Sequence, residues 1–255
     1  NLKNIPLMDL FMRNHVYFLS FILILNPIIL FTNETISLKK LEQNNGLFVI
    51  KGTLKPYTGI IKEIYKNKKI KYIGNFKNGQ KTGEWKYFED TGNIWLSENY
   101  KNGQKFGDSI RFHINGVPWK KGKYKNNNKN GKWDFFSIDG EILEQGNYLD
   151  DQKNGVWKKY HDNGKLWEKI NYKINIKHGL AQFYYQDGTL GNDENWKNGL
   201  KDGLWKMYYP NGKLRKQGYF KNDKKNGIWK TYSINQVLSI IEIWDNGLLI
   251  KTENP

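Results

Sequence analysis

Glycine, aromatic and lysine positions recur with a period of 24 residues from residue 59 to residue 250, without insertion or deletion. We number each unit from its leading glycine, which is position zero. The eight units begin at Gly59, Gly83, Gly107, Gly131, Gly155, Gly179, Gly203 and Gly227. A fixed period of this length is typical of a stacked array, in which each unit buries its apolar face only against its neighbours. The period therefore predicts one elongated domain.

A second glycine stands at position nine in six of the eight units, and Asn or Asp precedes it in five. These preceding residues are Asn115, Asp139, Asn163, Asp187 and Asn211. Asn-Gly and Asp-Gly are strong hairpin signals, because both central residues of a type I′ turn need positive φ. We therefore expect a type I′ turn at positions eight and nine. The predicted fold class is all-β, an elongated antiparallel sheet of eight stacked β-hairpins.

Such a turn makes position zero face position seventeen, and position two face position fifteen, across each hairpin. Position seventeen is aromatic in every unit: Phe76, Tyr100, Tyr124, Tyr148, Tyr172, Trp196, Phe220 and Trp244. We expect the glycine at position zero to leave room for each ring over the backbone. Position two carries Trp85, Trp133, Trp157, Trp205 and Trp229. Tryptophan placed so regularly is interpreted as structural first.

A second set of aromatic residues is expected on the opposite face, because position five differs in parity from position two. Its predicted cross-strand partner is position twelve. The interaction surface predicted from these two positions consists of Trp95, Trp119, Trp167, Phe112, Phe136, Tyr160, Tyr184 and Tyr208. Exposed Trp and Tyr are the residue types that dominate protein interfaces. The leading hypothesis is therefore a scaffold for protein–protein interaction.

Lysine occupies position twenty-two in seven units, beside the second turn of the repeat. These residues are Lys81, Lys105, Lys129, Lys153, Lys177, Lys201 and Lys225. Laid side by side, the hairpins would place them along one long basic margin of the sheet. With a net charge of +16, an anionic membrane surface is an alternative partner. Sheet twist of roughly 20° per strand lets only a few of these lysines face one plane, which favours a protein partner.

The N-terminal part has a different character. Residues 16–31 are apolar except for Ser20, Asn26 and Pro27, which is typical of a secretory signal and short for a spanning helix. We predict an N-terminal apolar helix and a signal-like or anchor segment over 1–37, a cap or linker over 38–58, the repeats over 59–250 and a tail over 251–255. The expected location is the cell envelope, exported or anchored, with a cytoplasmic product as the alternative.

The repeat also resembles a known family. Residues 76–85, Phe-Lys-Asn-Gly-Gln-Lys-Thr-Gly-Glu-Trp, and residues 196–205, Trp-Lys-Asn-Gly-Leu-Lys-Asp-Gly-Leu-Trp, are similar to the MORN repeat, and more closely to its bacterial variant in proteins labelled YwqK-family antitoxins. The resemblance implies an elongated sheet of hairpins that acts as an interaction scaffold. The antitoxin label implies a toxin as the partner, and this is a further alternative.

Candidate chemistry is sparse. The chain contains no cysteine, which excludes disulfides, thiolate metal sites and cysteine nucleophiles. His113 and His161 both fall at position six but lie two units apart, too far to share a metal. Glu98, Glu194 and Glu242 at position fifteen are better interpreted as partners of lysines than as catalytic carboxylates. We therefore expect no catalytic residue, metal or cofactor, and the pattern does not interleave aromatic and basic residues as nucleic-acid binding requires.

Overall fold

Two kinds of tight turn alternate along the chain and fold each unit into a hairpin. The computed structural model describes residues 35–255. The predicted apolar helix over residues 16–31 lies outside this range and stays a prediction. Within the range, no helix is long and apolar enough to cross a membrane. The described chain consists of β-strands and one short 3-10 helix, η1 (Leu38–Lys40), so the prediction of an all-β fold of stacked hairpins is confirmed.

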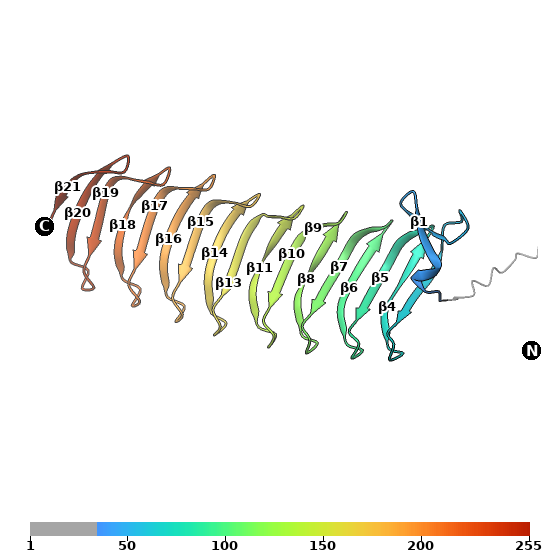
Figure 1. Ribbon diagram of the computed structural model, residues 1–255. Helices are drawn as coiled ribbons and strands as arrows, with labels where there is room; N and C mark the ends of the chain where they lie inside the picture. Colours follow the sequence, from blue (N-terminus) through green and yellow to red (C-terminus); the bar gives the residue numbers. More distant parts are fainter. Residues whose placement is uncertain (1–34) are drawn as a thin grey trace, which may run out of the picture. The chain divides into compact units, whose positions relative to one another are not determined.

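The strands run antiparallel, and 19 of them form one long sheet in which hairpin follows hairpin along the chain (Figure 1). A separate pair consists of β1 (Leu41–Asn44) and β2 (Leu47–Ile50). The long sheet consists of β3 (Gly59–Ile64), β4 (Ile70–Lys77), β5 (Gln80–Phe88), β6 (Ile94–Lys101), β7 (Gln104–Phe112), β8 (Pro118–Lys125), β9 (Asn128–Lys129), β10 (Gly131–Phe136), β11 (Ile142–Leu149), β12 (Gln152–Lys153), β13 (Gly155–Tyr160), β14 (Leu166–Lys173), β15 (Ile176–Tyr184), β16 (Leu190–Lys197), β17 (Leu200–Tyr208), β18 (Leu214–Lys221), β19 (Lys224–Tyr232), β20 (Leu238–Asp245) and β21 (Leu248–Glu253).

The turn at positions six to ten differs from the predicted type I′ turn. In the second unit, the amide of Gly92 donates to the carbonyl of Glu89, and the amide of Glu89 donates to the carbonyl of Asn93. Only the glycine has positive φ, 95° at Gly92. This is a three-residue loop, a type I turn followed by a left-handed residue. The Asn at position eight acts through its side chain instead, since Asn115 accepts from the amide of Val117 and donates to the carbonyl of Ile138 in the next unit.

The type I′ turns are at positions nineteen and twenty. Asn78 and Gly79 have φ of 51° and 74°, and they connect Lys77 to its cross-strand partner Gln80. The same two positions have positive φ in all eight units. The Asn-Gly signal is therefore correct for this second turn and misleading for the first.

The predicted pairing of position zero with seventeen and of two with fifteen is confirmed, for example Gly83 with Tyr100 and Trp85 with Glu98. The register then shifts by one residue between Tyr87 and Phe88. Position five pairs with position eleven, and position twelve is left unpaired in a β-bulge. The predicted pairing of five with twelve is therefore wrong, because the three-residue loop changes the register at that end of each hairpin.

Buried tryptophans form the core, and they pack on glycine at position fifteen of the preceding unit. A Cβ on Gly74 would lie 2.1 Å from the ring of Trp85, and Gly122, Gly146 and Gly218 are in the same relation to the next tryptophan. The expected contact between position zero and the rings is not found at Gly131, Gly155 and Gly227, where a Cβ would meet nothing within 4 Å. These three glycines serve the positive φ of the bend instead.

Where position two lacks a tryptophan, its side-chain volume complements that of position fifteen in the preceding unit. Ile170 faces Ala181, and Glu98 faces Ser109 across neighbouring strands. A large residue at position fifteen therefore goes with a small residue at position two of the next unit. Trp205 is the exception, because it faces Glu194 and donates its indole N–H to that carboxylate at 3.2 Å.

A cap covers the N-terminal end of the array. Ile36 pairs with Ile61 of β3 through backbone hydrogen bonds, and Leu41, together with Phe48, packs on the cluster around Phe76 and Trp85. The opposite end carries no such cover among the described residues, since every residue of β21 is exposed.

Candidate functional site

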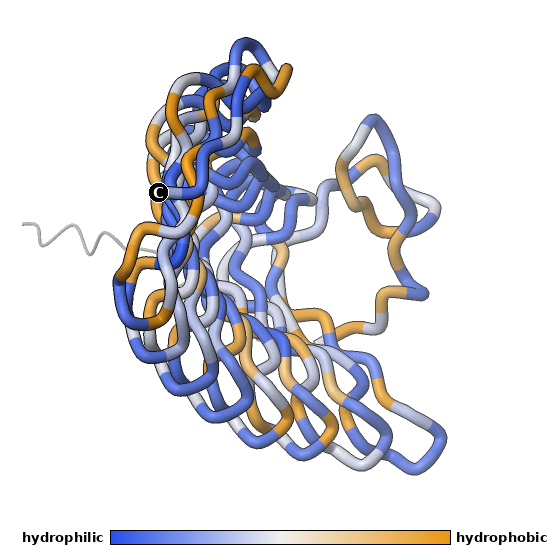
Figure 2. The backbone as a smooth tube through the Cα atoms, turned by 90° about the vertical axis from the view of Figure 1, so that its left-hand side faces the viewer, coloured by the Kyte–Doolittle hydropathy of each residue, from blue (hydrophilic) through white to orange (hydrophobic). Residues whose placement is uncertain are grey.

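The curved sheet has an inner and an outer face (Figure 2). We call inner the concave face, which carries positions two, four, thirteen, fifteen, seventeen and twenty-two, and on which the cap packs. Each buried tryptophan packs here against at least one ring of position seventeen. Trp157, for example, meets Tyr148 at 4.9 Å between centroids, and Trp133 meets Tyr124 and Tyr148 at 5.2 and 6.2 Å. These edge-on contacts form an aromatic layer that is interrupted where Ser109 and Ala181 replace the tryptophan.

The three tryptophans of position twelve lie on this inner face, which corrects the expectation that they share a face with position five. The bulge turns their side chains toward position four: the ring of Trp95 is 5.7 Å from that of Tyr87, and the Nζ of Lys159 is 5.5 Å from the ring of Trp167. Trp119 and Trp167 are 40% and 43% exposed. Among the described residues, they are the tryptophans that fall in the exposed class.

The predicted aromatic residues of position five lie apart from these tryptophans, on the outer face. They are Phe112, Phe136, Tyr160, Tyr184 and Tyr208, and all are half-buried. Phe112 pairs with Pro118, and Lys121 lies with its Nζ 5.1 Å from the ring of Phe136. The structure therefore divides the predicted interaction surface between the two faces.

The lysines of position twenty-two are placed over the aromatic layer, and not along an open margin as expected. Each of these lysines is the cross-strand partner of the aromatic residue at position seventeen, as Lys153 is of Tyr148. The Nζ–centroid distances on the nearest ring are 4.2 Å for Lys81, 5.1 Å for Lys105, 4.6 Å for Lys129, 4.0 Å for Lys153, 4.4 Å for Lys177, 5.4 Å for Lys201 and 4.2 Å for Lys225. These are cation–π contacts, so the lysines help to hold the layer together.

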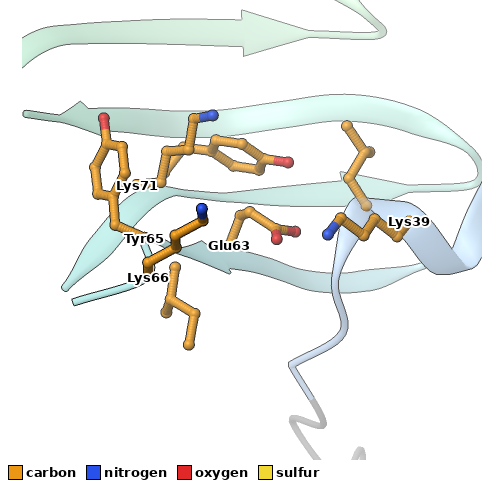
Figure 3. A pocket seen from close by; sticks show the side chains of 8 residues that line it. Lys39, Glu63, Tyr65, Lys66 and Lys71 are labelled. Carbon is orange, nitrogen blue, oxygen red and sulfur yellow. The ribbon is translucent and has the colours of Figure 1, made fainter. Parts of the chain in front are cut away.

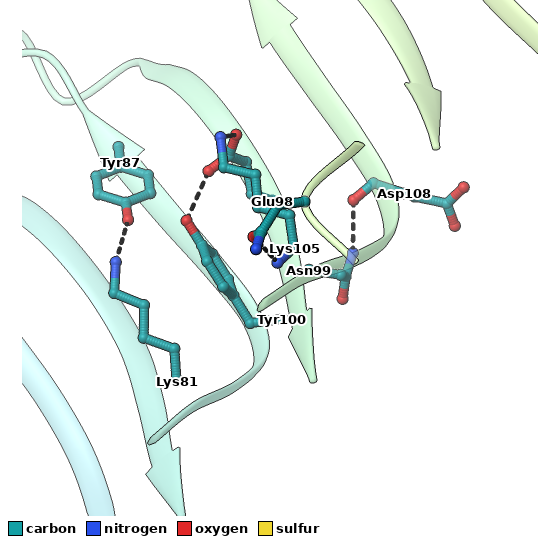
Figure 4. A network of polar contacts seen from close by, with 8 residues as sticks. Lys81, Tyr87, Glu98, Asn99, Tyr100, Lys105 and Asp108 are labelled. Carbon is teal, nitrogen blue, oxygen red and sulfur yellow. Dashed lines mark hydrogen bonds and ion pairs between the residues drawn. The ribbon is translucent and has the colours of Figure 1, made fainter. Parts of the chain in front are cut away.

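Glutamates neutralise several of these lysines, as the sequence predicted. Glu98 accepts from the Nζ of Lys105 at 2.6 Å and from the hydroxyl of Tyr100 at 2.8 Å, while Lys81 donates to Tyr87 at 3.1 Å (Figure 4). Burial lowers the pKa of Lys81 and raises that of Tyr100.

The other two glutamates of position fifteen behave alike. Glu194 accepts from Lys201 at 3.0 Å and from the indole N–H groups of Trp196 and Trp205. Glu242 lies 3.5 Å from Lys225 and accepts from the indole of Trp244. Each of these acids therefore has lysine and aromatic partners within the sheet.

The histidines connect neighbouring units. The Nε2 of His113 lies 3.1 Å from the carbonyl oxygen of Phe136, and that of His161 lies 3.0 Å from the carbonyl oxygen of Tyr184. Since a carbonyl accepts, each Nε2 carries the proton. No group of side chains in residues 35–255 could hold a metal ion.

A cavity of about 470 Å³ lies beside the cap, lined by Lys39, Lys66, Lys71, Glu63 and Tyr65 among others (Figure 3). Glu63 accepts a hydrogen bond from Ser37, and the Nζ of Lys71 lies 5.6 Å from the ring of Tyr65. Glu63 and Lys71 thus have partners within the described chain.

Sequence analysis missed one feature of the inner face, the cation pair Arg111 and Lys120. The two are cross-strand partners. Their positions, four and thirteen, vary in residue type between units, so no repeated signal marks them. In the correct register, the charges at positions four and thirteen of each unit would have identified the pair.

The comparison with protein families agrees with this architecture. The family model of the MORN repeat variant matches residues 57–78, 81–102, 153–173, 177–198 and 201–222. Such repeats commonly form modules that contact proteins or membranes, and proteins built from them are generally non-enzymatic scaffolds. No protein of curated function matches the chain. Five matches within a sheet of stacked hairpins support a MORN-repeat protein.

Proposed function

We propose that the chain is a non-catalytic scaffold that binds a protein partner on the inner face of its sheet, at the cell envelope. The observation that carries this proposal is the exposure of Trp119 and Trp167, 40% and 43%, on the same face where Trp133 is 1% exposed. Tryptophan is the residue type most enriched at interface hot spots. The sheet also holds both indoles in place before a partner binds, which reduces the entropic cost of association.

A membrane surface is the weaker alternative. Binding to an anionic leaflet needs lysines that reach its plane, and each contributes about 1 kcal/mol there. The lysines of position twenty-two instead lie over aromatic rings, and Lys105, Lys153 and Lys201 are ion-paired with glutamates. The positive charge of these lysines is therefore largely engaged in contacts within the sheet.

The envelope location rests on the apolar residues 16–31, which have the length of a secretory signal. Fractionation of the cell followed by N-terminal sequencing of the mature protein tests it. A mature chain recovered from the envelope or the medium supports the location, and an intact chain in the cytoplasm contradicts it.

Site-specific photo-crosslinking tests the binding face. We would place a benzophenone side chain at position 119 or 167 of the full chain and, as a matched control, at Ile142 of the outer face, which is 39% exposed. We expect covalent protein adducts from the two inner positions and few from the control. Adducts that form only at 142, or only with lipid, would rule the proposal out.

A further inference from the structure

The cation pair of the inner face has no acidic partner in residues 35–255. Arg111 in β7 and Lys120 in β8 are direct cross-strand neighbours, an arrangement in which like charges destabilise a sheet. At the same two positions, four and thirteen, of the units that follow, the charges alternate. Lys159 lies between Glu144 and Glu168 and is 3.3 Å from Glu168. Arg111 and Lys120 take part in none of the ion pairs found in the described chain.

The guanidinium of Arg111 is held between two indoles. Its Cζ lies 5.3 Å from the ring centroid of Trp95 and 5.0 Å from that of Trp119. The Nζ of Lys120 also lies 4.9 Å from the ring of Trp119. Contacts with two rings fix the plane of the guanidinium, so its donors are oriented before a ligand arrives.

Further cations add to the positive potential at this point. Burial lowers the pKa of Lys120, and Lys129, Arg111 and Lys105 act in the same direction. The one nearby carboxylate, Glu98, opposes this effect but is already bound to Lys105 and Tyr100. The cluster therefore attracts an anion that the described chain does not supply.

Resting on the proposed function, we infer that Arg111 and Lys120 bind a carboxylate in an acidic, extended segment of the protein partner, with an apolar side chain of that segment on Trp119. The planar fork of arginine fits a carboxylate with two hydrogen bonds. The pair lies on the concave face (Figure 2), which a narrow peptide segment can enter and a flat bilayer cannot follow.

The chain offers a matched control. Lys158 and Lys169 are also like-charged cross-strand partners, but at positions three and fourteen of the outer face. Neither makes a cation–π contact with a ring in the described chain. Neutralising them removes the same charge and leaves the indole-bound guanidinium intact.

The test measures binding of a fluorescein-labelled peptide of eight glutamates to the full chain by fluorescence anisotropy. We expect Arg111→Gln combined with Lys120→Gln to raise the Kd by at least about tenfold. Lys158→Gln combined with Lys169→Gln should change it by less than about twofold. Arg111→Lys keeps the charge but loses the fork, so its Kd should lie between these two. Thermal unfolding of each variant checks that the sheet is intact.

Equal weakening by both double variants would show diffuse attraction and overturn the inference. So would failure of the wild-type chain to bind the peptide, or binding to phosphatidylglycerol vesicles that depends on Arg111 and Lys120. Photo-crosslinking at position 167, which leaves Trp119 in place, separates the two proposals. A protein adduct that forms equally well in the variant lacking both cations leaves the scaffold function standing and removes only the acidic segment.

Discussion

A single methyl group at Gly146 should displace the buried indole of Trp157. A Cβ there would lie 2.3 Å from Cδ2 and 2.5 Å from Cε2 of the ring. Carbon atoms pack at about 3.5 Å, so the ring would have to move by roughly 1 Å. It has little room, because Trp157 is 2% exposed, Tyr148 lies 4.9 Å away and the Nζ of Lys153 lies 4.0 Å from its centroid. Overpacking of this kind costs about 1–3 kcal/mol.

The decisive measurement is a double-mutant cycle. Trp157→Ala alone should cost about 3–5 kcal/mol. In that background Gly146→Ala should be neutral or stabilising by about 0.5–1 kcal/mol, because glycine is the more costly residue to order in a strand. The four chains would be compared by urea unfolding followed by far-ultraviolet circular dichroism. A destabilisation by Gly146→Ala that is the same in both backgrounds would refute the proposed packing of ring on glycine.

Three further outcomes are expected from urea unfolding. Glu194→Ala should destabilise the fold by about 3–5 kcal/mol, because it leaves the partly buried Lys201 without its carboxylate partner. The control Glu84→Ala, at an exposed ion pair, should cost less than about 1 kcal/mol. Similar losses of stability in the two variants would contradict this prediction. Ile174→Asn should stabilise by about 1 kcal/mol, since Ile174 has φ of 50° in a type I′ turn, and a lowered midpoint would count against it. Burial raises the pKa of Asp193, so the folded state binds protons more tightly and stability should fall as pH rises through that pKa. Asp193→Asn should flatten this dependence from about pH 4 upward, and an unchanged slope would show that another group causes it.

The candidate site was only partly predictable. The lysines and position-fifteen glutamates were assigned to each other correctly, since opposite charges at fixed repeat positions meet in every unit that has both. The sheet face predicted for Trp95, Trp119 and Trp167 was wrong, because a one-residue bulge reverses the alternation of side chains on which the prediction depended. No repeat rule marked Arg111 and Lys120, which occur together in one unit, the one that starts at Gly107.

The sequence by itself determined the hairpin array, because an unbroken period of 24 residues requires every unit to make the same turns and the same neighbour contacts. It also determined the pairing of positions zero and two with positions seventeen and fifteen, where the register within each hairpin is unbroken. Only the tertiary structure decided which Asn-Gly turn is type I′, which glycine packs against the indole and which tryptophans are exposed. These depend on the register at the far end of each hairpin and on contacts between units, where a single extra residue moves a side chain from one face to the other.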